Sequence, residues 1–222
     1  ASLGFTKMEG TTVNAKDKIA YSALQNIQSS MVAGNAANVP GNGISVPKQL
    51  VAGAVMALNL KGGQKDTAGG TINSEWMPVD TKVLRAGEDI AADALGNTAN
   101  PNNIANPDNL KFSEKMRTLF IGEDSSQHVN NFLWAYNVDT KQLSRVMSIP
   151  SGGESTGLHA VDEINGWTYI MSNFQHAGDW GAIHSVVKDT LDPMIKANYK
   201  NKNGAAVGYL TAAAKQPSLN QA

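Results

Sequence analysis

The chain has 222 residues, of which 41% are hydrophobic and 17% charged, a length that suits one medium-sized domain with its own core. Its formal net charge of −1 excludes a global positive field for nucleic acid or anionic membrane. The longest apolar run, 50–58, is far below the roughly 20 residues that a membrane span needs, and no cysteine is available for a disulfide or a thiol nucleophile.

Five short apolar runs bounded by turn residues predict β-strands, at 18–24, 55–60, 117–121, 132–136 and 167–171. Residues 138–142 have the composition of a turn with strands on both sides, which predicts a hairpin over 132–149. Surface loops are expected at 33–47 and 92–107, where apolar residues are too few to form a core.

The C-terminal part has a different pattern. From Ile183 to Ile195 apolar residues recur at helical spacing, and Pro193 inside that pattern predicts a helix that is interrupted or bounded there. Residues 196–204 are polar, and 205–213 form a small-residue strand or helix. We therefore expect a helical or irregular tail over 181–222.

Three segments of the chain resemble one another. They are MEGTTVNAKDKIAYSAL from Met8, PDNLKFSEKMRTLFIGED from Pro107 and GESTGLHAVDEINGWTYIMSN from Gly153. Each has a carboxylate near its start, then a short β-like piece, a charged turn and an apolar strand; the carboxylates are Glu9, Asp108 and Glu154. The last two are 46 residues apart, within the 40–50-residue period of propeller blades. The alternative is a chance alignment of short hairpins.

The repeat predicts an all-β fold in which residues 1–180 form about three blades of a β-propeller. Propellers close with four to eight blades, so three would leave sheet edges and an apolar flank exposed. We therefore expect this chain to pack against another polypeptide segment. The alternative is a small β domain that closes on itself.

Equivalent carboxylates in successive blades converge on the central channel, because the innermost strand of each blade begins there. Carboxylates buried together repel, and a cation is the usual way to neutralise them. Ca²⁺ prefers carboxylate and carbonyl oxygens as ligands. The sequence thus predicts a metal site built from Glu9, Asp108 and Glu154; the alternative is that these residues only shape turns.

The same residues resemble the C-terminal half of the PhoX-type alkaline phosphatases, the calcium-dependent, iron-containing propeller phosphatases of bacteria. The matching elements stand in the family's order over roughly residues 4–180, with interruptions; they are FTKMEG, VNAKDKIAYSAL, NPDNLKFSEKMRTLFIGED, VNNFLWAY and GGESTGLHAVDEINGWTYIMSNFQHAGD. The resemblance implies a six-bladed propeller and a funnel-shaped site in which iron and calcium ions share carboxylate ligands. It also implies a periplasmic or extracellular location.

The resemblance also implies residue roles. Glu9 matches the metal-ligand Glu of the family's R-x-E-G motif, and Asp108 and Glu154 match acidic calcium-ligand positions. Lys7 stands where the family has an Arg that clamps the phosphate, so it is the expected substrate-binding residue and, with Glu9, a catalytic one. Lysine supplies the charge but not the bidentate fork of arginine.

Three further residues are weaker metal-ligand candidates. Asn109 adds a carbonyl oxygen beside Asp108, Asp124 lies near the same channel mouth, and His176 belongs to the NFQHAG signature. For His176 a hydrogen bond to a loop carbonyl is the preferred interpretation. The other three histidines are expected to be structural, because the sequence contains no HExxH or other paired zinc-ligand spacing.

The expected function is phosphomonoester hydrolysis in a metal site that uses Ca²⁺ and, by the resemblance, Fe³⁺. The family's iron site takes a Cys and carboxylates from its N-terminal half, which this chain lacks, so an N-terminal segment of the same protein is the expected partner. Neither a nucleic-acid partner nor a membrane span is expected. The alternative function is a non-catalytic calcium-binding propeller scaffold or interaction protein.

Overall fold

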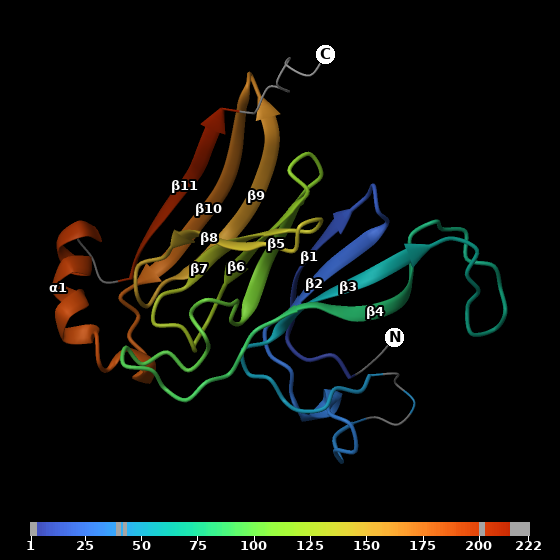
Figure 1. Cartoon of the computed structure of the whole chain (residues 1–222), viewed down its shortest axis with the longest axis horizontal. Coiled ribbons are helices and arrows are strands. Elements are labelled where there is room, and N and C mark those ends of the chain that lie inside the picture. Colours follow the sequence, from blue (N-terminus) through green and yellow to red (C-terminus); the bar gives the residue numbers. More distant parts are fainter. Residues whose placement is uncertain (1–3, 39–40, 42–43, 200–202, 214–222) are drawn as a thin grey trace.

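The computed structural model describes residues 4–38, 41, 44–199 and 203–213, which form three antiparallel sheets (Figure 1). The first sheet has β1 (Met8–Asn14), β2 (Ile19–Leu24), β3 (Ala54–Lys61) and β4 (Met77–Ala86) in chain order. The second has β5 (Pro107–Ser113), β6 (Thr118–Glu123), β7 (Phe132–Asn137) and β8 (Leu143–Ser148). The third places β10 (Trp167–Ala177) between β9 (Glu154–Ile164) and β11 (Gly204–Ala213).

Helices are short and few in the part of the chain that the structure describes. Two 3₁₀ turns span Ser29–Met31 (η1) and Ala182–His184 (η2), and helix α1 spans Lys188–Tyr199. None of the helices described here is long and apolar enough to cross a membrane.

The three sheets pack face to face through the second one. In β6, Leu119 and Ile121 point into the core shared with the first sheet, while Phe120 points into the core shared with the third. A strand that is apolar at three successive positions is what burial on both faces requires, because successive side chains alternate between faces. The first strands of the sheets come together: β1 contacts β5, and β5 contacts β9.

Charged turns link neighbouring sheets at one end of the first strands, β1, β5 and β9. Arg117, in the turn after β5, bonds to Asp17 in the turn after β1. Asp162 of β9 accepts hydrogen bonds from the Ser113 hydroxyl and, at 3.3 Å, from the Lys115 backbone N–H. These contacts fix how the sheets sit against one another, and Glu9, Asp108 and Glu154 lie toward the opposite end of the same strands.

The strand predictions are confirmed. Each of the five expected runs falls on a strand, namely β2, β3, β6, β7 and β10, and the hairpin over 132–149 is β7 and β8. The all-β class with one short helix near the C-terminus is confirmed as well. The described residues form three separate sheets and no closed barrel or propeller, so the propeller arrangement stays a prediction.

Three expectations need correction. Helix α1 continues through Pro193 to Tyr199, because packing of Ile195 in the core offsets the hydrogen bond that proline cannot donate. Residues 204–213 form β11 and pair with β10, which confirms the strand alternative for 205–213 and shows that the expected tail is not wholly helical or irregular. The two expected loops also contribute to the core, since Ile44 and Ile104 are buried.

Candidate metal and phosphate site

A left-handed backbone residue stands two positions before each of the three predicted carboxylates. The φ angle is 46° at Lys7, 44° at Asn106 and 78° at Gly152, and the carboxylates that follow are Glu9, Asp108 and Glu154. This conformation is unfavourable for residues other than glycine and persists where the surroundings enforce it. A residue with positive φ therefore comes just before or at the start of β1, β5 and β9, the first strands of the three sheets, and precedes each carboxylate by two positions.

Two of the carboxylates also lie in β-bulges. The register of β1 on β2 shifts across Glu9, and that of β5 on β6 shifts across Asp108; in β9 the shift comes after Glu154. A bulge leaves one residue unpaired and redirects its side chain, which is why bulges are frequent next to active sites. At Gly10, inside the first bulge, an added Cβ would lie 2.4 Å from the backbone oxygen of Asp108. Only glycine allows β1 and β5 this close together.

Local hydrogen bonds hold the first two carboxylates. The Lys7 ammonium lies 3.3 Å from Glu9 Oε1, and both side chains are partly exposed. The Asn109 side-chain amide donates to Asp108 Oδ1 at 2.8 Å. This bond uses the Asn109 amide nitrogen, so the role of its carbonyl oxygen as a cation ligand stays a prediction.

Asp124 is positioned by groups from both the first and the second sheets. Its Oδ2 and its backbone oxygen accept hydrogen bonds from the Gln25 side-chain amide at 2.9 and 3.1 Å. Its backbone N–H donates to the carbonyl of Asn106, whose side-chain oxygen accepts from the Ser125 hydroxyl at 2.7 Å. Asn106 also donates to the backbone oxygens of Gln25 and Val51, so this buried asparagine organises the mouth of the site.

Glu154 and His176 form the third part of the site. His176 Nδ1 lies 2.8 Å from the Gly152 carbonyl oxygen, which fixes the proton on Nδ1 because a carbonyl only accepts. His176 Nε2 then faces Glu154 Oε1 at 3.6 Å. The expectation that His176 bonds to a loop carbonyl is confirmed, and the same bond turns its second nitrogen toward the carboxylate.

Neighbouring carboxyl groups raise the pKa values of two of the site carboxylates. Burial, together with the negative charges of Glu9 and Asp124, raises the pKa of Asp108 to about 6. Burial and the adjoining Asp124 carboxyl raise the pKa of Glu154 to about 7, against the opposite effect of His176. The structure thus brings Glu9, Asp108, Asp124 and Glu154 into one region in which Lys7 and His176 offset only part of the mutual repulsion.

A cavity of about 420 Å³ adjoins this region. Asp124, Glu154 and His176 line one side of it, and the segment after β10, with Trp180 and Ile183, lines the other. Helix α1 holds that segment in place, because Trp180 Nε1 donates to Asp192 Oδ1 at 2.8 Å. Asp179 and His184 of the same segment also line the cavity, so both of its sides carry polar groups, and Trp180 and Ile183 add apolar surface.

The donor set is made mainly of carboxylate oxygens, which suit a hard cation. Carboxylate oxygens with raised pKa values and few hydrogen-bond donors are typical of a Ca²⁺ site. Within the described ranges, however, no group of three or more His, Asp or Glu side chains lies close enough to hold one metal ion. The iron that the resemblance implies stays a prediction, because the chain has no Cys and the remaining iron ligands are expected from an N-terminal segment.

Sequence reasoning missed Gln25 and Asn106. Asn106 has a signal in the repeat, because it stands two residues before Asp108 as Lys7 stands two before Glu9. Gln25 has no signal in the sequence, because its role depends on the packing of the first sheet against the loop after β6.

Comparisons with known proteins give one structural match. No family model matches the chain, and no curated protein does either. The solved structure of Pseudomonas fluorescens PhoX in complex with vanadate, a transition state analogue, superposes with a TM-score of 0.55 at 19% sequence identity. The match covers 94% of this chain and 34% of that one, so the chain spans about a third of the length of its structural neighbour. At this identity the likeness shows that the two folds are similar.

Proposed function

We propose that this chain is part of a periplasmic or extracellular phosphomonoester hydrolase of the PhoX type. The observation that carries the proposal is the shared placement of Glu9, Asp108 and Glu154, each near the start of the first strand of its sheet and two residues after a backbone position with positive φ. The fold similarity to PhoX is consistent with it. In this proposal the three sheets are propeller blades and the carboxylates face a common channel.

In this proposal each residue has a distinct task. Glu9, Asp108 and Glu154, with Asp124 beside them, would each contribute to binding Ca²⁺ together with ligands from outside the described residues, because no three of them lie close enough to hold one ion. The bound Ca²⁺ would supply charge for polarising phosphoryl oxygens. Lys7 meets the phosphate through its ammonium group, and Glu9 keeps that group in place at 3.3 Å. The cavity beside Glu154 receives the organic part of the phosphoester against Trp180.

The proposal includes a partner. The face of the first sheet that points away from the second is apolar and forms a hollow of about 470 Å³, lined by Val13, Ala20, Leu58, Leu60, Trp76 and Pro78. On the third sheet, Trp167, Met171, Val207 and Tyr209 are 38–79% exposed. We call these the outer faces of the first and third sheets. A further segment of the same protein, N-terminal to this chain, would cover them and supply the iron ligands.

The test uses the protein isolated from its source with whatever polypeptide accompanies it. We expect calcium together with iron by metal analysis, and turnover of a phosphomonoester. Lys7→Ala should lower kcat/KM about 10²-fold or more, as loss of a charge-stabilising group does, whereas Lys7→Arg should retain or raise it. Glu154→Gln should weaken calcium binding about tenfold or more.

A matched control lies on the same strand. Glu163 is at the far end of β9, 3.5 Å from the Lys115 ammonium and partly exposed, so Glu163→Gln should change neither calcium binding nor turnover. Calcium without turnover would instead support a non-catalytic calcium-binding scaffold. Unchanged calcium titration in Glu154→Gln would contradict the metal role of Glu154.

A further inference from the structure

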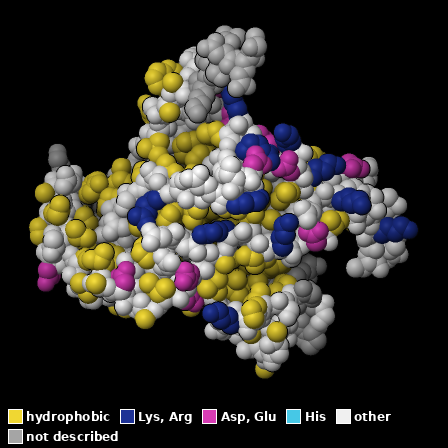
Figure 2. All heavy atoms as spheres, viewed as in Figure 1, with side chains coloured by type: hydrophobic (Ala, Val, Ile, Leu, Met, Phe, Trp, Pro, Cys, Tyr) yellow, Lys and Arg dark blue, Asp and Glu magenta, His cyan; other side chains and the backbone are white. Residues whose placement is uncertain are grey.

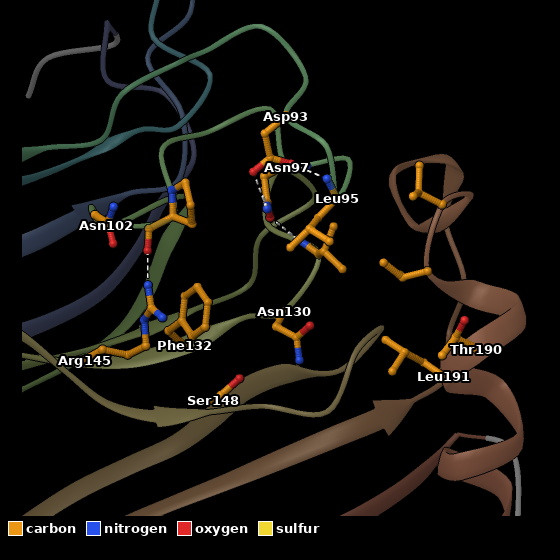
Figure 3. Close-up of a pocket in the computed structure, with 14 residues that line it drawn as sticks. Asp93, Leu95, Asn97, Asn102, Asn130, Phe132, Arg145, Ser148, Thr190 and Leu191 are labelled. Carbon is orange, nitrogen blue, oxygen red and sulfur yellow. Dashed lines mark hydrogen bonds between the residues drawn. The ribbon is translucent and has the colours of Figure 1, made fainter.

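A second cavity, of about 760 Å³, lies apart from the carboxylate site and shares no lining residue with it. Figure 3 shows its walls: the loop with Asp93 and Leu95, the strands β7 and β8 with Phe132 and Arg145, and helix α1 with Leu191. The volume falls in the range of small-molecule pockets, about 300–1,000 Å³. Nothing in the proposed phosphatase site uses this space.

A register shift builds the polar end of this cavity. Ser148 pairs with Phe132 and Arg145 pairs with Trp134, with a shift between these two pairs. Paired residues of antiparallel strands point to the same face, so all four side chains lie on one face of the second sheet. Without the shift, Arg145 and Ser148 would point to opposite faces, because they are an odd number of residues apart.

The Arg145 guanidinium is held in a fixed orientation. Its centre lies 4.1 Å from the Phe132 ring centroid and 5.2 Å from that of Trp134, and it donates to the Pro101 carbonyl oxygen. Within the described part of the chain it has no carboxylate partner. Stacking leaves the remaining N–H groups of the planar fork available for an anion. Asn102 and Ser148 line the same cavity.

The remainder of the cavity is mainly apolar. Val129 and Phe132 are buried in its wall, whereas Leu95 and Val186 are 56% and 61% exposed. Leu191 adds to this wall from α1 (Figure 3). Hydrophobic side chains are exposed around α1 in the space-filling view as well (Figure 2). An apolar body placed here would cover side chains that otherwise face water.

Asp93 is the acidic residue that lines this cavity, and its hydrogen-bonding capacity is already in use. Its Oδ1 accepts from the backbone N–H groups of Leu95, Gly96 and Asn97 at 2.8–2.9 Å, and its Oδ2 accepts from the Asn97 side chain at 2.8 Å. Asp93 therefore shapes the rim. Among the described residues that line the cavity, Arg145 is the cation, which suits a single negative charge better than two.

We propose that this cavity binds an organic monocarboxylate, with the carboxylate on Arg145 and an aliphatic or aromatic body between Leu95 and α1. A planar carboxylate matches the guanidinium fork. One cation balances one negative charge, whereas a doubly charged phosphate monoester would leave excess negative charge near Asp93. The proposal does not depend on phosphatase activity.

The test is calorimetric titration of the folded protein with decanoate below its micelle concentration. We expect saturable one-to-one binding, and at least tenfold weaker binding of decanol and of decyltrimethylammonium. Arg145→Gln should weaken decanoate binding at least tenfold, and Arg145→Lys less, since it keeps the charge. Lys82→Gln is the charge-matched control on an exposed position of β4 and should leave affinity unchanged.

A second variant covers the case in which Arg145→Gln does not fold. Thr190 is exposed on α1 and lines the cavity, so Thr190→Trp should fold, fill the space and abolish binding. The proposal is overturned if decanoate does not bind, if decanol binds equally well, or if Thr190→Trp leaves decanoate affinity unchanged. The last result would mean that the ligand adheres to the outer faces of the sheets instead.

Discussion

Two kinds of buried carboxylate occur in this chain, and the contrast between them concerns the metal proposal. Glu123 is fully buried and accepts hydrogen bonds from the Trp134 indole at 2.6 Å and from the Ala105 and Phe132 backbone N–H groups, and His128 Nδ1 lies 3.0 Å from its Oε2. Three donors and the neighbouring imidazole satisfy its polar atoms within the protein. Asp108 instead has one side-chain donor, Asn109, and acidic neighbours. Glu123 is structural, and the Asp108 environment favours an external cation.

The first prediction concerns pH and stability in the absence of cations. The pKa values of Asp108 and Glu154 are raised to about 6 and about 7, above their ordinary values near 4. Between about pH 4 and pH 7 the folded state therefore binds more protons than the unfolded state, and the free energy of unfolding falls as pH rises. The loss is nearly complete about one pH unit above the pKa of Glu154, where both carboxylates are charged.

The measurement is thermal unfolding at pH 5 and pH 8, in EDTA and in calcium. The variant Asp108→Asn with Glu154→Gln should lose this part of the pH dependence and, in EDTA at pH 8, gain about 2–4 °C, the shift that 1 kcal/mol produces at this chain length. Calcium should stabilise the wild type at pH 8 more than at pH 5, because it binds the deprotonated carboxylates. Identical pH profiles for wild type and variant would contradict the prediction.

At the scale of the elements, the contact of β1 with β5 depends on Gly10. An added Cβ there would meet backbone atoms of Asp108 and Leu110 at 2.4 and 2.8 Å, and backbone atoms cannot swing aside as side chains do. Gly10→Ala should therefore destabilise the fold by about 1–3 kcal/mol, as overpacking does, and should weaken calcium binding because it moves Glu9. Chemical denaturation and calcium titration measure the two effects.

Gly208→Ala is the matched control for that substitution. Gly208 is also a strand glycine, in β11, and nothing lies within 4 Å of its added Cβ. It should be neutral or slightly stabilising. If Gly10→Ala were equally neutral, the close approach of the two inner strands would not be what positions Glu9.

The elements also show which structural features the sequence carries. Runs such as Leu119–Phe120–Ile121 reveal a doubly buried strand, because apolar residues at successive positions have few other uses. Strand β4 escaped prediction, since most of its residues are exposed and its ladder with β3 supplies the pairing. The bulges across Glu9 and Asp108 also depend on pairing with distant residues, so the sequence showed the carboxylates but not how they are directed.

At the scale of the whole molecule, the outer faces of the first and third sheets expose apolar side chains. In the third sheet, Ile170 and Leu210 pair and point into the core with the second sheet. Met171 and Tyr209, the next pair, therefore point the other way, and they are 38% and 61% exposed. An apolar sheet face of this kind marks an interaction surface.

The last prediction follows from these faces. Purified alone, the chain should self-associate in proportion to its concentration, since apolar faces without a partner bury one another. Val207→Lys with Tyr209→Lys should suppress that association, and should also prevent the proposed N-terminal segment from co-purifying, because one face serves both.

Val51→Lys is the control: Val51 is 52% exposed in a loop away from the outer faces and should change neither result. Size-exclusion chromatography with light scattering measures the first effect. A stable 23.5 kDa monomer at high concentration, with no accompanying polypeptide in the source, would contradict the prediction. That result would mean that the three sheets are stable without a partner, with the apolar outer faces of the first and third sheets exposed to water.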